Sequence, residues 1–236
     1  MRAAFLLMIG FYLQITSLWG ATDYRKAPQA LISLPDSLSR PFLALGDSYT
    51  IGESVDRNER FPAQTVILLK AMGIQTGEPL YIAQTGWTSK DLQNAIAKAT
   101  LLPEYSVVSL LVGVNDQFQG LDTGAYRKRF IRLLEQAIRL SGNRPRQVFV
   151  LSIPDYGVTP FGGGSKRISK EIDEFNEINK EITLNHHVAY IDITSISRMA
   201  AKDPTLSAND GLHPSGKQYK LWAMKLAKAI AGGRID

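Results

Sequence analysis

Residues 41–50 read Pro-Phe-Leu-Ala-Leu-Gly-Asp-Ser-Tyr-Thr, a short apolar run that ends in Gly-Asp-Ser. Residues 107–116 read Val-Val-Ser-Leu-Leu-Val-Gly-Val-Asn-Asp and have the same form, an apolar run followed by glycine and polar residues. Apolar runs without alternation are typical of parallel strands that are buried on both faces of a sheet. The two stretches therefore predict strands at Pro41–Leu45 and Val107–Val112, each followed by polar residues.

Strands and helices are predicted to alternate along the rest of the chain. The further strands are expected at Leu80–Ala83, Gln147–Ile153 and Val188–Ile191, and the helices at Phe61–Met72, Ser89–Ala99, Tyr126–Leu140, Ile168–Leu184 and Ser215–Ala231. This alternation predicts an α/β fold in one domain over residues 21–236, with a parallel sheet covered by helices on both faces. In such sheets ligands bind outside the carboxyl ends of the strands, so chemistry is expected just after each strand.

Composition narrows the class of protein. The 236 residues are 44% hydrophobic and 21% charged, carry a formal net charge of +5, and include no cysteine. The basic residues are scattered through predicted helices, which favours solvated helix faces over a nucleic-acid-binding surface. The absence of cysteine excludes disulfides, a thiolate nucleophile and a cysteine-ligated metal.

The first twenty residues have the composition of an export signal. Arg2 gives a positive start, residues 3–19 are almost wholly apolar, and Gly20 and Ala21 provide small residues for cleavage. We therefore expect residues 1–20 to be a cleaved signal peptide, a secreted or periplasmic location, and no stable membrane insertion of the mature chain. An uncleaved N-terminal anchor is the alternative. Leu18 is large for the third position before a cut after Gly20, so the cleavage site stays open.

Ser48 is the candidate nucleophile, because it follows the first predicted strand. Backbone N–H groups and the positive end of a helix would assist a nucleophile there. The alternative is that Asp47 and Ser48 only cap a helix. The surroundings contain no Gly-x-Ser-x-Gly elbow, so the pattern differs from that of ordinary α/β-hydrolases.

His213 is the candidate base among three histidines. It lies in Asp-Gly-Leu-His-Pro, residues 210–214, where Asp210 is placed to accept a hydrogen bond from the Nδ1–H of His213 across one tight turn. That leaves Nε2 for the serine. His186 and His187 lack an acid at a suggestive spacing, and we interpret them as exposed or capping residues.

Two candidate oxyanion donors follow other strands. Asn115 comes after the strand at 107–112, and Gly86 comes after the strand at 80–83. An amide side chain and a glycine N–H are suitable donors for a developing oxyanion. Each residue, taken alone, is better explained as part of a simple turn.

Together these stretches resemble the SGNH, or GDSL-like, hydrolase family. The resemblance covers about residues 42–230 and rests on four blocks, namely 42–50, Gly86, 113–116 and 210–214. The first block departs from the family name, because Tyr49 stands where that name has leucine. The resemblance implies a flavodoxin-like, three-layer α/β/α sandwich with a five-stranded parallel sheet. It implies no metal and no organic cofactor.

The resemblance also implies a role for each matching residue. Ser48 would be the nucleophile, His213 the base and then the acid, and Asp210 the group that orients His213. The backbone N–H groups of Ser48 and Gly86 and the side chain of Asn115 would form the oxyanion hole. Asp47 and Asp116 would hold the turns around the site.

The expected function is hydrolysis of carboxylic esters through an acyl-enzyme. The substrate would be a small-molecule, carbohydrate or lipid ester, and a small acyl group on a carbohydrate is favoured. An O-acyltransferase with the same triad is the main alternative, and a non-catalytic binding module is a further one. A flavodoxin-like phosphate binder is disfavoured because it would not need His213.

Loops after the strands are expected to form the walls of the site. The candidate lining residues are aromatic, namely Trp87, Phe118, Tyr156 and Phe161. The run Gly162-Gly163-Gly164 lacks the spacing of a nucleotide-binding loop and predicts a flexible loop near the rim.

Overall fold

The computed structural model describes residues 41–233, and the predicted signal peptide lies outside these described residues. The strands are β1 (Pro41–Gly46), β2 (Gly77–Ala83), β3 (Val107–Leu111), β4 (Val148–Leu151) and β5 (Ala189–Ile191). The helices are α1 (Ser48–Ile51), α2 (Phe61–Ala71), α3 (Ser89–Lys98), α4 (Val114–Phe118), α5 (Thr123–Leu140), α6 (Lys166–Asn185), α7 (Thr194–Ser197) and α8 (Gly216–Gly232). Short 3₁₀ turns connect several of them.

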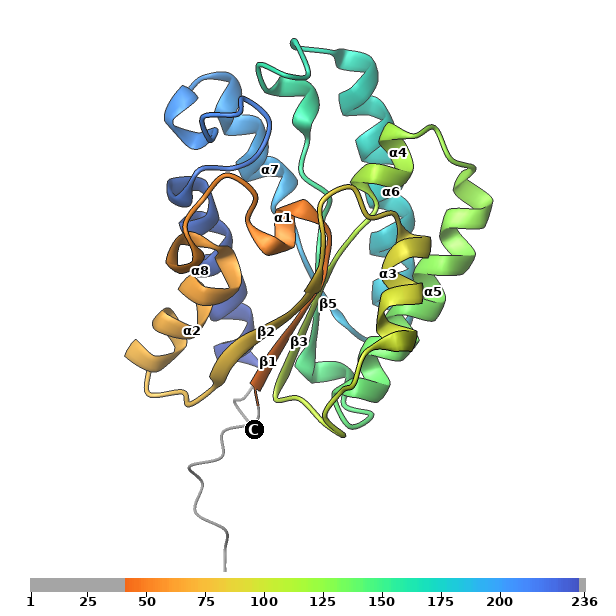
Figure 1. The fold of residues 1–236 in the computed structure, drawn as a ribbon, viewed down its shortest axis with the longest axis vertical. Coiled ribbons are helices and arrows are strands. Elements are labelled where there is room, and N and C mark those ends of the chain that lie inside the picture. The colour runs from red at the N-terminus through yellow and green to blue at the C-terminus, as the bar shows by residue number, and fades with distance from the viewer. Residues whose placement is uncertain (1–40, 234–236) are drawn as a thin grey trace, which may run out of the picture. The chain divides into compact units, whose positions relative to one another are not determined.

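The five strands form one parallel sheet in the order β2-β1-β3-β4-β5. This is the flavodoxin-like order, in which the chain reverses direction across the sheet between β1 and β3. The register pairs Gly46, the last residue of β1, with Ala83 of β2 and with Leu111 of β3. The carboxyl ends of these three strands therefore lie side by side, at the end of the sheet where α1 is seen in Figure 1.

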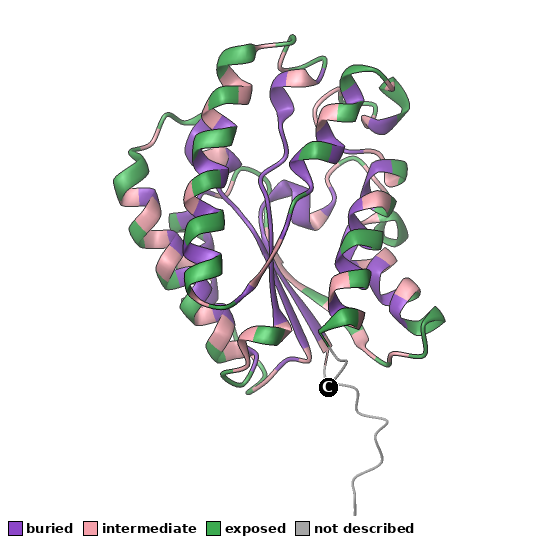
Figure 2. Cartoon of the chain, turned by 180° about the vertical axis from the view of Figure 1, so that it is seen from behind, coloured by how far each residue is buried: buried purple, intermediate pink, exposed green. Residues whose placement is uncertain are grey.

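Helices cover both faces of the sheet, as predicted. Helices α2 and α8 pack together on one face, and α3, α5 and α6 lie on the other (Figure 1). The central strands β1, β3 and β4 are buried almost throughout, whereas the edge strands β2 and β5 are partly exposed. Figure 2 shows each long helix buried toward the sheet and exposed on its outer side. Burial on both faces explains why the central strands read as continuous apolar runs.

Polar side chains in the sequence mark where the helices begin. Thr88 caps α3 in a capping box with Asp91, whose carboxylate accepts a hydrogen bond from the Thr88 N–H at 3.0 Å. Asp122, Ser165 and Ser215 cap α5, α6 and α8. Each cap satisfies a backbone N–H that has no partner inside its helix.

The predicted elements differ from the structure mainly at their ends and in two short helices. Helices α4 and α7 are not predicted from the sequence, because helices of four or five residues show no helical periodicity. The strand expected at Gln147–Ile153 is shortened to β4, since Gln147 belongs to a 3₁₀ turn. The class of fold, the strand count and the layers are confirmed.

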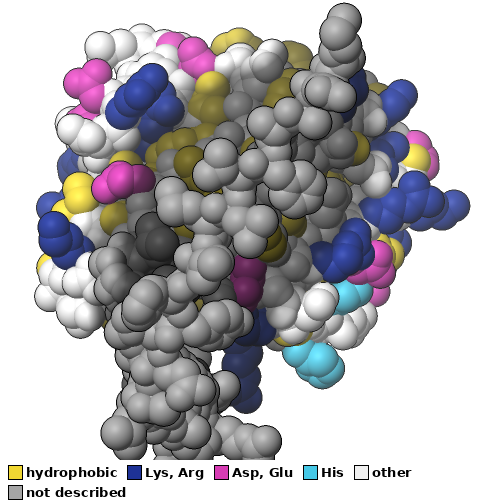
Figure 3. Space-filling view, turned by 60° about the horizontal axis from the view of Figure 1, so that its bottom comes forward, with side chains coloured by type: hydrophobic (Ala, Val, Ile, Leu, Met, Phe, Trp, Pro, Cys, Tyr) yellow, Lys and Arg dark blue, Asp and Glu magenta, His cyan; other side chains and the backbone are white. Residues whose placement is uncertain are grey.

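Charged side chains are interspersed on the surface that Figure 3 presents. Lys and Arg side chains lie there at separate places, with acidic side chains between them. Within residues 41–233, no helix combines the length and the apolar character needed to cross a membrane.

Candidate active site

Ser48 lies at the carboxyl end of β1, as the first residue of α1. Asp47 caps this helix, because its Oδ1 accepts a hydrogen bond from the Tyr49 N–H at 3.0 Å. Gly46 makes the turn feasible, since a Cβ there would overlap the Thr50 hydroxyl and the Leu111 carbonyl. The sequence suggests two roles for the Gly-Asp-Ser motif, helix capping and a nucleophilic serine. The structure is compatible with both, since Asp47 caps the helix and Ser48 faces a cavity.

Ser48, His213 and Asp210 form one hydrogen-bonded series. The Nε2 of His213 lies 2.9 Å from the Oγ of Ser48, and its Nδ1 lies 2.7 Å from the Oδ2 of Asp210. Only 5% of Ser48 and 6% of His213 is exposed, so water has little access to the bond between them. The series has the geometry that lets an imidazole take a proton from a serine hydroxyl.

A tight turn holds the carboxylate of Asp210 beside His213. Its Oδ1 accepts the backbone N–H groups of Leu212 and His213, both at 2.9 Å, and Gly211 turns the chain with a φ of +69°. Partial burial opposes ionisation, but hydrogen bonds from Ser54, Leu212 and His213 hold the pKa of Asp210 well below its usual range. Asp210 is thus an ionised acceptor for the imidazole at neutral pH.

Tyr49, the residue that departs from the family name, packs on the histidine. Its ring lies 5.0 Å from the His213 ring, tilted by 53°, and only 3% of Tyr49 is exposed. An aromatic neighbour at this distance restricts the orientation of the imidazole. This contact cannot be predicted from the sequence, because nothing near Tyr49 along the chain pairs it with His213.

The candidate oxyanion donors lie after neighbouring strands. Asn115 is the second residue of α4, and its Nδ2 donates one hydrogen bond to the Trp87 carbonyl at 3.0 Å. Gly86 is in the left-handed region, with a φ of +79°. Among the described residues, no acceptor pairs with the backbone N–H of Ser48 or of Gly86. These donors are available to a ligand.

Asp116 holds the loops around Asn115 together. Its carboxylate accepts the N–H of Ser89 at 2.7 Å, the Ser89 hydroxyl at 2.6 Å and the Arg129 guanidinium at 3.1 Å. Arg129 also donates to the Ser89 hydroxyl at 2.7 Å. Since Asp116 is fully buried, these bonds join α3, α4 and α5 behind the candidate oxyanion site.

A cavity of about 90 Å³ opens beside Ser48 and His213. Three of the four predicted lining residues, Phe118, Tyr156 and Phe161, form its walls together with Leu212. The fourth, Trp87, instead packs against the core. A second cavity of about 390 Å³ shares the same three aromatic residues and continues between α4 and α6.

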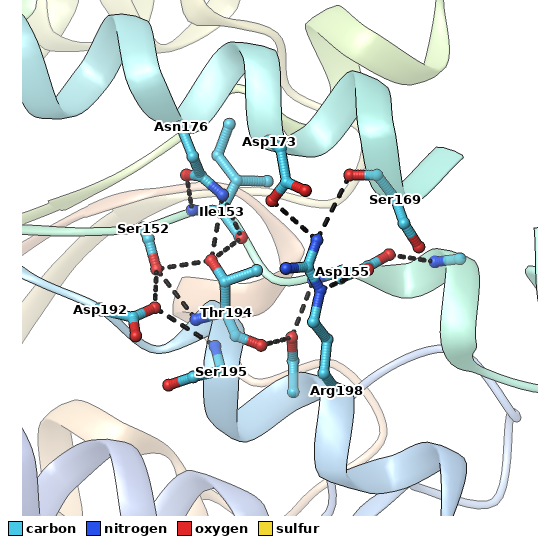
Figure 4. Close-up of polar contacts among 12 residues, drawn as sticks. Ser152, Ile153, Asp155, Ser169, Asp173, Asn176, Asp192, Thr194, Ser195 and Arg198 are labelled. Carbon is cyan, nitrogen blue, oxygen red and sulfur yellow. Dashed lines mark hydrogen bonds and ion pairs between the residues drawn. The ribbon is translucent and has the colours of Figure 1, made fainter. Parts of the chain in front are cut away.

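A buried polar network fixes the loop that carries Tyr156 and Phe161 (Figure 4). Arg198 donates to Asp155 at 2.8 Å and to Asp173 at 2.7 Å, joining the loop after β4 to α6. Asn176 bonds both backbone groups of Ile153, at 2.7 and 3.0 Å. This network was not anticipated from the sequence, because its members are far apart along the chain and follow no motif.

The glycine run at 162–164 forms a hydrogen-bonded turn. The N–H of Gly163 donates to the Thr159 carbonyl at 2.9 Å, and the N–H of Ser165 donates to the Gly157 carbonyl at 3.0 Å. Gly162 must be glycine, because a Cβ would overlap the Tyr156 carbonyl. The run therefore fixes the rim residue Phe161.

The remaining histidines lie away from this site. His186 follows α6, where its Nδ1 is 2.8 Å from the Ile182 carbonyl, and His187 is exposed in the next turn. Their interpretation as capping or exposed residues agrees with these positions. Within residues 41–233, no group of three acidic or histidine side chains is arranged to hold a metal ion.

A parallel α/β sheet with serine, histidine and carboxylate in series at its carboxyl edge is typical of the class of serine ester hydrolases. The chain belongs to the GDSL-like lipase/acylhydrolase family, because residues 44–221 match the model of that family. The family resemblance drawn from the four sequence blocks is thereby confirmed.

Individual relatives agree with this assignment. A multidomain esterase from Ruminococcus flavefaciens is 30% identical over 131 residues, which is 53% of this chain and 16% of that protein. This chain thus matches only a small part of that relative. Among solved structures, a lipase/acylhydrolase from Enterococcus faecalis shares the fold with a TM-score of 0.67 at 19% identity, and the match covers 82% of this chain and 96% of that protein. The acetylxylan esterase Axe2 from Geobacillus stearothermophilus shares the fold with a TM-score of 0.63 at 19% identity, and the match covers 81% of this chain and 94% of that protein.

Proposed function

We propose that this protein hydrolyses carboxylic esters through an acyl-enzyme formed on Ser48. The observation that carries the proposal is the series of two hydrogen bonds from Ser48 through His213 to Asp210, at 2.9 and 2.7 Å. A serine hydroxyl is a weak nucleophile until a base takes its proton, and His213 is the only histidine within reach among the described residues.

The reaction proceeds in two steps. In the first step Ser48 Oγ attacks the ester carbonyl carbon while Nε2 of His213 takes the hydroxyl proton. The oxyanion is stabilised by the N–H groups of Ser48 and Gly86 and by the free amide hydrogen of Asn115. His213 then protonates the leaving alcohol. In the second step a water molecule, deprotonated by His213, attacks the acyl-enzyme and releases the carboxylic acid.

The cavity beside Ser48 favours a small acyl group. Its volume of about 90 Å³ is well below the range of roughly 300–1,000 Å³ that is typical of small-molecule sites. The name of one structural relative, an acetylxylan esterase, is consistent with a small acyl group. We infer that the acyl group is acetyl or little larger.

The neighbouring cavity supports a carbohydrate as the alcohol. Its volume of about 390 Å³ is in the range of small-molecule sites. The shared aromatic rings offer apolar faces, while Gln117, Arg167 and Glu171 on its wall supply hydrogen-bonding groups for hydroxyls. This combination suits an acetylated sugar. We therefore propose deacetylation of an exported or cell-surface carbohydrate, in keeping with the signal peptide predicted for residues 1–20.

The test is hydrolysis of p-nitrophenyl acetate, butyrate and octanoate and of an acetylated xylo-oligosaccharide, with Ser48→Ala and His213→Ala beside the wild type. We expect turnover of the acetyl substrates, a fall in rate with chain length, and near-complete loss in both variants. Wild-type inactivity, or variants that match the wild type, would contradict the proposal. Acetyl transfer to an added sugar in preference to water would instead identify an O-acyltransferase.

A further inference from the structure

We propose that Ser54 is a positioning residue that holds the catalytic carboxylate of Asp210 against the segment carrying the nucleophile. This inference rests on the proposed function, because it assumes that Ser48, His213 and Asp210 act together. It assigns a role to a residue outside the four sequence blocks, on the turn that follows α1.

The contact is direct and joins distant parts of the chain. The hydroxyl of Ser54 donates to Oδ2 of Asp210 at 2.6 Å, across 156 positions of sequence. The same oxygen accepts the ring Nδ1–H of His213 at 2.7 Å. The other donors to Asp210, the N–H groups of Leu212 and His213, come from its own turn. Ser54 is thus the one donor, within the described residues, that fixes this carboxylate from outside its turn.

Glu53, the residue before Ser54, is bonded to the nucleophile. The N–H of Glu53 donates to the carbonyl of Ser48 at 3.0 Å, which closes the end of α1. Besides the ring contact of Tyr49 with His213, two hydrogen bonds join the segments of the triad, one between His213 and Ser48 and one between Ser54 and Asp210. The first link is lost whenever Ser48 carries an acyl group, because its oxygen then has no proton to share. The second link remains and keeps His213 oriented for the water step.

The backbone of Ser54 has an unfavourable conformation that the surrounding structure must hold in place. Its φ of +64° lies in the left-handed region, which serine rarely adopts. Such a conformation persists only where its surroundings hold it, and it is concentrated at functional sites. Here the conformation directs the hydroxyl to Asp210. About 30% of the Asp210 side chain is exposed, so without Ser54 water would compete for this oxygen.

The test compares Ser54→Ala and Ser54→Gly with the wild type and with Ser48→Ala. Both variants remove the hydroxyl, but glycine accepts the left-handed backbone without strain and should keep the native turn. Thr205→Ala is the matched control, because it removes a hydroxyl that donates to another exposed aspartate, Asp203, at 2.5 Å.

We expect kcat for p-nitrophenyl acetate to fall about tenfold to a hundredfold in the alanine and glycine variants, with KM changed less than about twofold. Thr205→Ala should match the wild type. Wild-type kcat in Ser54→Gly, or the same loss in Thr205→Ala, would overturn the inference. If the wild type is inactive or Ser48→Ala remains active, it is the proposed function that fails.

Discussion

Nε2 of His213 lies 2.9 Å from Oγ of Ser48, although 165 positions of sequence separate the two residues. The fold creates this contact by placing Ser48 directly after β1 and His213 just before α8. Helix α8 packs on the same face of the sheet as α2, which brings its leading loop over the end of β1 (Figure 1).

Asn115→Ala should lower the rate of the chemical step. The variant removes one oxyanion donor, so we expect kcat to fall about a hundredfold to a thousandfold while KM changes little. It also removes the bond to the Trp87 carbonyl, so thermal unfolding must be measured in parallel. An increase in KM with an unchanged kcat would show instead that Asn115 contributes to substrate binding and not to the chemical step.

Asp210→Asn should preserve the shape of the turn but disturb the imidazole. The amide still accepts backbone N–H groups, but it lacks the negative charge that stabilises the imidazolium during proton transfer. We expect kcat to fall by about a thousandfold or more with little change in unfolding temperature. Steady-state kinetics with p-nitrophenyl acetate measures this, and a loss below about threefold would show that another group orients His213.

Asp47 should make stability depend on pH between about 4 and 8. Burial raises its pKa from the ordinary 3.8 to about 8, while the hydrogen bond from Tyr49 acts in the opposite direction. The folded protein therefore keeps a proton that the unfolded chain has already lost, so this carboxyl destabilises the fold progressively as the pH rises from about 4 through 8.

Asp47→Asn removes this titration and still caps α1, since the amide oxygen can accept the Tyr49 N–H. The gap in free energy of unfolding between the variant and the wild type should shift in favour of the variant from pH 6 to pH 9. Denaturant unfolding at the two pH values measures the shift. Parallel curves for both proteins would show that Asp47 does not change protonation in this range.

Phe161→Ala should widen the acyl cavity and change chain-length preference. Phe161 lines the cavity and is 56% exposed, so its loss should cost little stability. We expect the ratio of kcat/KM for hexanoate over acetate to rise about tenfold, which corresponds to about 1.4 kcal/mol in transition-state binding. Met224→Ala, at an exposed methionine of α8, is the control. An unchanged ratio of kcat/KM for hexanoate over acetate would show that the acyl group does not bind in the cavity lined by Phe161.

The sheet could be predicted from the sequence because its central strands, β1, β3 and β4, are buried on both faces. That burial leaves continuous apolar runs, as at residues 107–112, and parallel strands must be separated by crossover helices. The positions of Ser48, Gly86, Asn115 and His213 followed from the same logic, since each comes after a strand or before the last helix. The structure places them where this logic expects, and their catalytic roles stay a prediction.

The supporting contacts could not be predicted, because they depend on residues that only the fold brings together. Ser54 is an exposed polar residue in a loop, and nothing near it in the sequence points to Asp210. Arg198 bonds Asp155 and Asp173 from a third segment of the chain. Helix α4, which carries Asn115, is too short to show a helical period, and no element was predicted there.

Covalent labelling of Ser48 tests the central claim most directly. The purified protein is treated with a p-nitrophenyl alkylphosphonate, and intact mass and peptide mapping follow the adduct. The account predicts one phosphonyl group per chain, carried by Ser48, no adduct in Ser48→Ala, and much slower labelling in His213→Ala. An unlabelled wild type, or equal labelling of Ser48→Ala, would contradict a nucleophilic Ser48 activated by His213.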